Sequence, residues 1–342
     1  MGKVSKIDLV ITWVDGSDQQ WQEEKNKYSK EIKNKESNNS ARYRDWDNFK
    51  YVFRSIEKNM PWINNIFLVT CGQVPSWLNI NNPKVKLVFH EQFIPKEYLP
   101  TFSSHVIELN LHRIEGLSEN FIYFNDDIFA INPLEEKDFF INGLPCDSGI
   151  LNIHCPKKSL MIHTIANNDT GIINEHFDIK SNLKRKKYWF NFKYGAKNIL
   201  QNIILSNCPR FPGFKQFHMS NSFLKSTFEE IWSEEYDTLN SVCLHKFRNV
   251  LDVNQWVVRE WQLVSNRFVP TKKYKIGQMI DFEKMEVNKS LALCEKTLFS
   301  KKYKLICIND GDTIENFEVL SKKVNLLLEE KFPNRSSFEK NN

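Results

Sequence analysis

The sequence predicts an α/β fold with a mostly parallel, Rossmann-like sheet flanked by helices, an inserted helical region and a C-terminal helix. In the first half of the 342 residues, short apolar runs alternate with stretches of helical periodicity, which is typical of parallel sheets. Near the end, apolar side chains recur at helical spacing. Hydrophobic residues make up 41% of the chain and aromatic residues 13%, so the composition is that of a globular protein with a large core.

Each expected element follows from its own pattern. Apolar runs predict strands at residues 7–14, 66–70, 85–89 and 121–124. Helical periodicity predicts helices at residues 46–59, 104–115 and 314–330, and it returns across residues 222–261. The helix at 314–330 is amphipathic, with apolar positions at Phe317, Leu320, Val324, Leu327 and Leu328.

Three stretches lack such a pattern. Residues 22–45 are polar and charged, and we expect them to form a mobile surface loop. Residues 133–212 are interrupted by glycine and proline, which indicates an insertion. The residues from Pro333 onward are expected to be loose.

Composition excludes several classes of protein. The formal net charge of +5 comes from 47 basic and 42 acidic residues spread along the chain, which does not indicate nucleic-acid binding. The seven cysteines are odd in number and form no CxxC pair, which argues against a disulfide framework or a zinc ribbon and favours a reducing cytoplasm. No apolar run approaches the roughly 18–20 residues that span a bilayer. We expect a cytoplasmic protein that is soluble or peripheral to a membrane.

The turn after the first strand is a candidate site, because ligands of parallel sheets bind beyond the carboxyl ends of the strands. Asp15, Gly16, Ser17 and Asp18 follow that strand directly. They place two carboxylates, a hydroxyl and a permissive glycine backbone where a nucleotide or its pyrophosphate would lie. The alternative is an ordinary Asp-Gly turn that ends a strand.

A second acidic turn follows the strand at 121–124. Asn125, Asp126 and Asp127 stand between two apolar runs, where two adjacent carboxylates are costly to bury without a cation or a hydrogen-bond network. Mg²⁺ suits such a turn, because it takes one or two carboxylates and leaves its other positions to water and substrate phosphates. The alternative is again a plain strand-end turn.

The helix expected at 104–115 gathers titratable groups on one face. At about 100° per residue, four such side chains fall within roughly 80° of one another, with apolar side chains opposite. These four are His105, Glu108, His112 and Glu115. A solvated face is the alternative, and a metalloprotease is excluded because no His-Glu-x-x-His motif is present.

Basic side chains supply candidates for phosphate binding. Arg42 and Arg44 precede Asp45, and guanidinium groups suit bidentate phosphate recognition, although surface charge pairing would explain them equally well. His218 and Arg248 are single residues that would not stand out unaided. The run 184–190 mixes cations with aromatic rings, which suits an anionic membrane surface, a polyanionic acceptor or an exposed helix edge.

Taken together, these segments resemble the Stealth family, the hexose-1-phosphate transferases of microbial capsular polysaccharide synthesis and their animal relatives. Residues 7–18 resemble the first signature block of that family. The second block is matched at residues 42–45, 61–62, 69–78, 99–104, 112–118 and 125–127. The resemblance covers about the first 135 residues with few gaps.

Two later segments resemble the remaining blocks. Residues 217–219, which include His218, resemble the third block, although the family often has Pro-His where this chain has Ser220 and Asn221. Residues 246–248 together with Asp252 resemble the fourth block, whose arginine is thought to contact the donor phosphate.

The resemblance implies a nucleotide-sugar transferase type of sheet and transfer of a sugar-1-phosphate from a nucleotide-sugar to a hydroxyl of an acceptor glycan. A phosphodiester would form and a nucleoside monophosphate would leave. The catalytic residues implied are His218, Asp127, Arg248 and His105, with His218 as the base and His105 as its alternative. Asp126 and Asp127 would hold Mg²⁺ or Mn²⁺. The substrate-binding residues implied are Asp15, Gly16, Asp18, Arg44, Asp45, Asn125, Glu108 and His112.

The resemblance also implies partners and a division of the chain. The expected donor is a UDP-sugar, and the acceptor is a glycan that could be lipid-linked, with the enzyme at the inner face of the cell membrane. We expect residues 1–135 and 216–280 to form the catalytic core, 136–215 an insertion facing acceptor or membrane, and 281–342 a C-terminal helical extension.

Two other functions remain open at this point. A conventional glycosyltransferase would use the same donor and release a nucleoside diphosphate. A non-catalytic binder of glycans or polyanions would draw on the nine tryptophans and the basic aromatic run, and its binding would not depend on Mg²⁺ or on Asp127.

Overall fold

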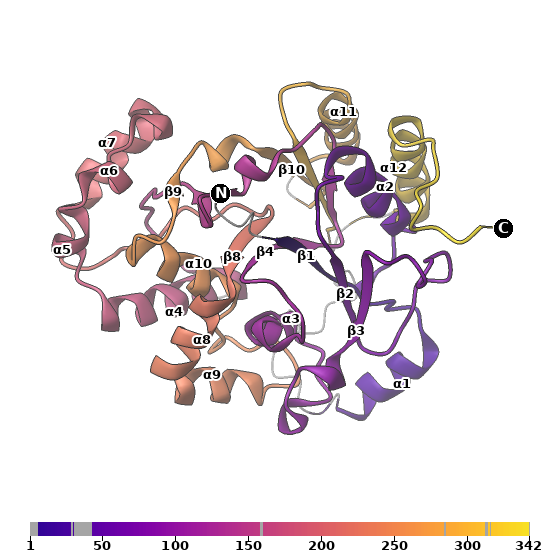
Figure 1. Cartoon of the computed structure of the whole chain (residues 1–342), viewed down its shortest axis with the longest axis horizontal. Coiled ribbons are helices and arrows are strands. Elements are labelled where there is room, and N and C mark those ends of the chain that lie inside the picture. Colours follow the sequence, from indigo (N-terminus) through magenta and orange to yellow (C-terminus); the bar gives the residue numbers. More distant parts are fainter. Residues whose placement is uncertain are drawn as a thin grey trace.

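The predicted α/β class is confirmed by the computed structural model, which describes residues 6–28, 30, 43–157, 160–283, 285–311, 314 and 316–341. A five-stranded sheet of order β3-β2-β1-β4-β8 forms the centre (Figure 1). Strands β1 to β4 are parallel, and β8 runs antiparallel to β4. The strands are β1 (Ile7–Thr12), β2 (Ile66–Thr70), β3 (Val85–Phe89), β4 (Asn120–Asn125) and β8 (Asn221–Leu224).

Both faces of the central sheet are buried, which explains why its strands read as continuous apolar runs. Side chains alternate between two hydrophobic cores along each strand, as the pleat requires. In β1, Leu9 and Ile11 enter one core, whereas Val10 enters the other. The same alternation in β4 sends Ile122 to the first core and Phe121 to the second.

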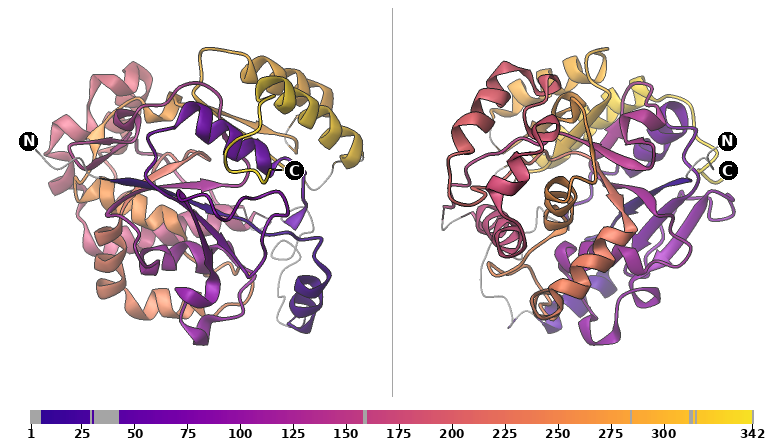
Figure 2. Two further views of the ribbon diagram at one scale, coloured as in Figure 1. Left: turned by 45° about the vertical axis from the view of Figure 1, so that its right-hand side comes forward. Right: turned by 60° about the vertical axis from the view of Figure 1, so that its left-hand side comes forward.

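Two layers of elements cover these faces (Figures 1 and 2). The first core lies under α2 (Phe49–Asn59), α11 (Val287–Leu298), α12 (Phe317–Lys331) and a small sheet of β10 (Gly277–Asp281), β11 (Leu305–Asn309) and β5 (Ile128–Ala130). The second core lies under α3 (Ser104–Asn110), α8 (Lys225–Glu234), α9 (Tyr236–Cys243) and α10 (Gln255–Val264).

The inserted helical region lies at one end of the long axis of the molecule, with α12 toward the other end (Figure 1). It contains β6 (Phe140–Ile141), β7 (Leu144–Asp147), α4 (Met161–His176), α5 (Ile179–Leu183), α6 (Lys186–Trp189) and α7 (Gly195–Leu205), and β7 also pairs with β9 (Val269–Pro270). Ile173, Trp189 and Phe214 belong to the second core. The insertion therefore packs into the rest of the protein.

Short 3-10 turns connect several of these elements. They span His90–Gln92, Lys96–Tyr98, Leu111–Arg113, Glu136–Asp138, Phe192–Tyr194 and Lys273–Lys275. None of the helices in the described part of the chain is both long and apolar enough to cross a bilayer.

The prediction of a mobile loop at 22–45 is wrong for its beginning. Helix α1 (Gln19–Lys27) starts after Asp18, whose Oδ1 accepts a hydrogen bond of 2.7 Å from the backbone N–H of Trp21. Trp21 is the only buried residue of α1, so the helix shows no apolar periodicity in the sequence. Residues 29 and 31–42, including Arg42, lie outside the described residues.

The expectation of a loose C-terminal end is also wrong. Phe338 is buried, and its backbone carbonyl accepts a 2.7 Å hydrogen bond from the N–H of Asn79. Glu339 is buried too, in an ion pair with Arg54 of α2. In addition, the extension from residue 281 is not only helical, because it contributes β11 to the small sheet.

Candidate functional site

The sheet topology brings four distant segments to one edge. Thr12 and Asn125 are register partners in parallel strands, so the two acidic turns leave the sheet side by side. Strand β8 is antiparallel to β4 and starts at Asn221, opposite Tyr123, so His218 reaches the same edge from the other direction. Strand β11 pairs antiparallel with β5, which sets Cys307 opposite Ile128.

Asp127 lies at the centre of this edge. Its Oδ2 is 3.7 Å from Nε2 of His218 and accepts a 3.1 Å hydrogen bond from the thiol of Cys307. Its Oδ1 is buried and lacks a hydrogen-bond partner among the described residues. Ligand atoms of all three side chains lie within 4.8 Å of one another. These three residues could therefore share a metal ion.

Burial and neighbouring charges shift the pKa values of the residues in and around the second acidic turn. Burial, followed by the charges of Asp127 and Asp45, raises the pKa of Asp126 to about 7. For His218, burial lowers the pKa, but the carboxylates of Asp127 and Glu108 more than offset it, so the net shift is upward. Crowded carboxylates with raised pKa values would gain from a cation or a cationic substrate group.

A second group of titratable residues is built on Asp252, in the loop before α10. Its carboxylate is bonded to Nδ1 of His105 at 2.8 Å and to Nδ1 of His245 at 2.7 Å, and it accepts the N–H of Asn249 at 2.9 Å. Burial would raise the pKa of Asp252, but the hydrogen bonds from the two histidines lower it overall. Burial lowers the pKa of His105, which favours a neutral ring whose Nδ1–H points at Asp252.

Arg248 connects the two groups electrostatically. Its guanidinium donates a 2.7 Å hydrogen bond to Oγ of Ser104, the first residue of α3. Its positive charge adds to the lowering of the His105 pKa and opposes the rise of the His218 pKa. Arg248 is therefore a cation near both histidines, held by a neutral hydroxyl.

Of the four titratable side chains predicted to share one face of the helix, only His105 and Glu108 lie at the candidate site. Glu108 is buried and accepts hydrogen bonds from the Tyr123 hydroxyl at 3.3 Å and the Gln255 N–H at 3.5 Å. The structure does not bring His112 to the site. The α-helix ends at Asn110 and continues as a 3-10 turn, so the angular spacing used for the prediction no longer applies.

His112 lies in an aromatic cluster instead. Its ring stacks on Phe228 with 5.7 Å between centroids and lies near Trp232. Burial lowers its pKa to about 3. The ring is therefore neutral at physiological pH and packs as part of the second core. Glu115 is exposed.

In the first acidic turn, the two carboxylates hold the backbone. Asp15 Oδ1 accepts hydrogen bonds from the backbone N–H and the hydroxyl of Ser17, at 2.8 and 2.6 Å. The side-chain amide of Gln73 binds both the N–H and the carbonyl of Asp15, at 2.8 and 2.9 Å. Asp18 caps α1. Asn125 is the last residue of β4.

Gly16 sets the position of the segment that carries Arg44 and Asp45. A Cβ atom on Gly16 would lie 1.9 Å from the carbonyl oxygen of Tyr43. Arg44 is not free to meet a phosphate, because its Nε is 3.1 Å from a carboxylate oxygen of Asp310 and its Nη2 donates to the Gly311 carbonyl at 3.2 Å.

Asp45 carries a raised pKa, caused first by partial desolvation and opposed by the N–H of Asp47, with the nearby Asp15 charge adding to the rise. Asp15 and Asp126 are both coupled to Asp45 by charge. The two acidic turns and Asp45 therefore form one electrostatic neighbourhood.

We expect Gly16→Ala to lower the free energy of unfolding by about 1–3 kcal/mol, the usual cost of overpacking, and to weaken nucleotide-sugar binding. The added methyl group must displace the backbone of Tyr43 and with it Arg44 and Asp45. Urea unfolding and calorimetric titration measure the two effects. The control is Gly171→Ala in α4, where a Cβ would meet no described atom within 4 Å apart from its chain neighbours and the nearby backbone of its own helix. Wild-type stability and affinity in Gly16→Ala would contradict the assigned contact.

Cys307 and Asp310 were missed from the sequence, although a signal was present. Residues 305–308 are an apolar run followed by Asn309 and Asp310, the same pattern that identifies the acidic turn at Asn125, Asp126 and Asp127. The pattern was overlooked because this part of the chain was assigned to a helical extension. Gln73 carried the same signal, because it follows the strand that ends at Thr70, whereas His245 had none, because its role depends on tertiary contacts.

The similarity of this chain to known proteins extends beyond the first 135 residues. Models of the Stealth protein match at conserved region 1 over residues 5–33 and at conserved region 2 over residues 42–146. A capsular polysaccharide phosphotransferase WcwK of Streptococcus pneumoniae is 40% identical, with 99% of this chain and 100% of the relative covered. The exopolysaccharide phosphotransferase cps2G of Lactiplantibacillus plantarum is 40% identical over 98% of this chain and 96% of the relative.

A third relative is the receptor polysaccharide phosphotransferase WefC of Streptococcus oralis, which is 38% identical over 98% of this chain and 100% of its own length. Among solved structures, the apo form of the bifunctional glycosyltransferase WbbM aligns with a TM-score of 0.36 and 10% identity, covering 98% of this chain and 53% of that one. That structural likeness is too low to support a conclusion.

Proposed function

Because the chain belongs to the Stealth family of polysaccharide phosphotransferases, we propose that it transfers a sugar-1-phosphate from a nucleotide-sugar to a hydroxyl of an acceptor glycan. The product is a phosphodiester in a capsular or other cell-surface polysaccharide, and the leaving group is a nucleoside monophosphate. The observation that carries the proposal is the pairing of His218 with Asp127, within the electrostatic reach of Arg248.

His218 is the proposed general base. The acceptor hydroxyl loses its proton as it attacks phosphorus, and the imidazole of His218 takes that proton. Asp127, 3.7 Å away, stabilises the imidazolium that forms. The His218 side chain is 37% exposed, whereas that of His105 is 2% exposed. Access therefore favours His218 over His105, whose Nδ1 is already bonded to Asp252.

Arg248 is the proposed contact for the transferred phosphate. Phosphoryl transfer depends mainly on positioning and on neutralising the charge of the phosphoryl oxygens. Among the described residues, the hydrogen-bond partner of the Arg248 guanidinium is the neutral hydroxyl of Ser104, whereas Arg44 is paired with the carboxylate of Asp310. We therefore assign the phosphate to Arg248 and give Arg44 the task of holding the segment 43–47.

Asp126 and Asp127 are proposed to hold Mg²⁺ or Mn²⁺. The residues fit a hard divalent ion, because Asp127 offers a buried oxygen without a hydrogen-bond partner among the described residues and the pKa of Asp126 is raised to about 7. When bound, the ion would neutralise charge on the donor diphosphate. Asp127→Asn should weaken Mn²⁺ binding at least tenfold by electron paramagnetic resonance. Asp18→Asn, which keeps the helix cap, should bind Mn²⁺ as the wild type does. Equal Mn²⁺ binding by the wild type and both variants would contradict the assignment of Asp127 as a metal ligand.

The donor set also predicts how the site responds to zinc. Cys307 and His218 are softer ligands than carboxylates and suit Zn²⁺, so Zn²⁺ should inhibit by joining Asp127, His218 and Cys307. Cys307→Ser should raise the half-inhibitory Zn²⁺ concentration at least tenfold. Co²⁺ bound to the wild type should show a thiolate charge-transfer absorption that Cys307→Ser lacks. Equal inhibition of the wild type and Cys307→Ser by Zn²⁺ would show that Cys307 is not a zinc ligand.

The donor to test first is a UDP-sugar, and the acceptor a lipid-linked glycan. We would incubate the enzyme and Mg²⁺ with donors labelled with ³²P in the phosphate attached to the sugar. Under the proposed reaction the label moves to the glycan. A conventional glycosyltransferase would leave the label on the nucleotide, and a non-catalytic binder would leave the donor intact. His218→Ala is the control for a contaminating transferase.

A further inference from the structure

Helix α7 has its polar and apolar faces reversed relative to an ordinary surface helix. Its inward face carries Asn198 and Asn202, which are 6% and 0% exposed. Its outward face carries Leu200, Ile203 and Ile204, which are 58%, 50% and 60% exposed. The exposed residues follow the i, i+3, i+4 spacing of a single helical stripe.

Specific hydrogen bonds fix this orientation. The side-chain amide of Asn202 donates to the carbonyls of Gly149 at 2.8 Å and Trp189 at 2.5 Å, and its oxygen accepts the N–H of Leu151 at 2.8 Å. The helix therefore cannot turn its aliphatic side chains inward without leaving several buried polar groups unpaired, each at a considerable cost. The outward apolar stripe is a stable feature of the fold.

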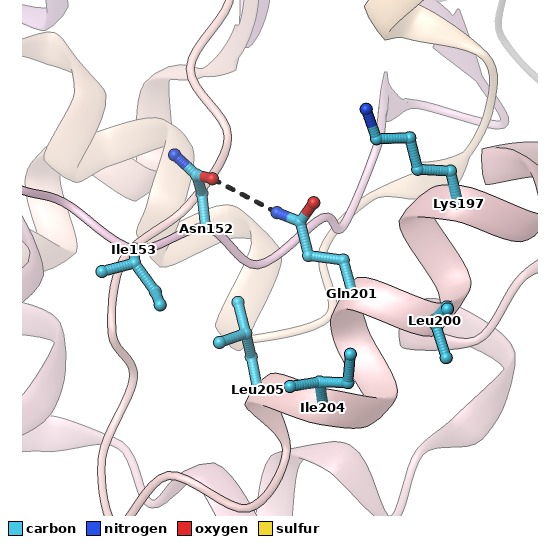
Figure 3. Close-up of a pocket in the computed structure, with 7 residues that line it drawn as sticks. All are labelled: Asn152, Ile153, Lys197, Leu200, Gln201, Ile204 and Leu205. Atoms are coloured by element: carbon cyan, nitrogen blue, oxygen red, sulfur yellow. Dashed lines mark hydrogen bonds between the residues drawn. The ribbon is translucent and has the colours of Figure 1, made fainter.

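The stripe continues into neighbouring residues. Ile153 is 55% exposed and lies across a depression from α7, as Figure 3 shows. Phe192, in the turn before α7, is 82% exposed. The residues that line the depression are Asn152, Ile153, Lys197, Leu200, Gln201, Ile204 and Leu205, and none of them belongs to the candidate site.

The surroundings of the stripe are basic. Residues 179–228 contain no aspartate or glutamate but ten lysines and arginines. Lys184, Arg185, Lys186, Lys187 and Lys197 are exposed, and no ion pair with another described residue is found for these five. An apolar stripe beside unpaired cations is the pattern of a surface that binds anionic lipid, with aliphatic side chains in the acyl boundary and cations at the phosphates.

We propose that α6 and α7 form a docking surface for an anionic lipid bilayer. We call it the α6–α7 surface, with Phe192, Leu200, Ile203 and Ile204 as its apolar part and residues 184–187 and Lys197 as its basic part. This binding goes beyond the proposed reaction and does not depend on it. Beyond α7, the chain reaches His218 without another helix.

The test is sedimentation of the full chain with vesicles of phosphatidylcholine alone or with phosphatidylglycerol added. We expect binding to the mixed vesicles at least tenfold stronger than to the neutral ones, and weaker binding as salt is raised. The variant Ile203→Ser/Ile204→Ser should lose at least tenfold in affinity. The matched control is Val319→Ser/Leu326→Ser on α12, whose side chains are 53% and 71% exposed and which should bind as the wild type does.

Several results would overturn the proposal. They are absence of wild-type binding to the mixed vesicles, equal binding by the α7 and α12 variants, or an oligomer without lipid that the α7 variant alone dissociates. In the last case the surface is a contact between copies of the chain. Transfer to a water-soluble acceptor should be unchanged in the α7 variant, so a failure of docking and a failure of the proposed reaction are told apart.

Discussion

His218→Ala should lower the rate constant for transfer by about 10²–10⁴-fold, the usual contribution of a general base, while the nucleotide-sugar still binds. The imidazole lies against Asp127 and is 37% exposed, so its removal takes away the proton acceptor and leaves no large cavity. Single-turnover transfer of labelled donor measures the rate, and calorimetric titration measures donor binding.

His105→Gln is the comparison that separates the two candidate bases. His105 is buried and bonded to Asp252, so we expect this variant to lose stability as well as activity, whereas His218→Ala should unfold as the wild type does. A fully active His218→Ala would remove His218 from the mechanism. An inactive His105→Gln of normal stability would then assign the base to His105.

Arg54→Ala should have the largest effect on stability, lowering the free energy of unfolding by about 3–5 kcal/mol, as expected when one partner of a buried ion pair is removed. Arg54 donates from Nε and Nη2 to Glu339 at 2.9 and 3.0 Å, and from Nη1 to Glu329 at 3.0 Å and the Phe332 carbonyl at 2.9 Å. These bonds fasten the C-terminal segment to α2. Urea unfolding followed by tryptophan fluorescence measures the loss.

The Arg54–Glu339 pair also predicts a dependence on pH. Burial would raise the pKa of Glu339, but its bonds to Arg54 lower it overall. The stability from this pair is therefore fully present above the unfolded pKa of about 4.3 and is lost as pH falls through the folded pKa. As the pH falls below about 4.3 toward the lowered folded pKa of Glu339, Arg54→Ala/Glu339→Gln should lose less stability than the wild type. Parallel pH profiles would show that the pair contributes nothing.

Much of the fold could be predicted because its signals are local. The strands β2 and β3 could be predicted with their observed bounds: β2 is buried along its whole length and forms an apolar run, and the edge strand β3 keeps apolar side chains at every position except Lys86. Strand β8 was missed, because it has four residues and adjoins a helix. Helix α1 was missed because it buries a single tryptophan.

For the candidate site too, residues with a local sequence signal could be predicted and those that depend on distant contacts could not. The two acidic turns could be predicted because the carboxyl ends of parallel strands meet at one edge of the sheet. Residues that directly follow such strands in the sequence are therefore brought together. The sequence could not say that Asp127, and not Asp126, faces His218, nor that Cys307 joins them, since both depend on antiparallel pairings between distant strands. The misplacement of His112 came from extending α-helical geometry past Asn110.

The most direct test of the central claim is to identify the nucleotide released from a UDP-sugar during transfer, by chromatography of the reaction products. Attack at phosphorus predicts UMP, formed in step with the glycan phosphodiester and formed far more slowly by His218→Ala. Release of UDP would mean that the bond to the anomeric carbon is cleaved, and it would contradict the proposed phosphoryl transfer.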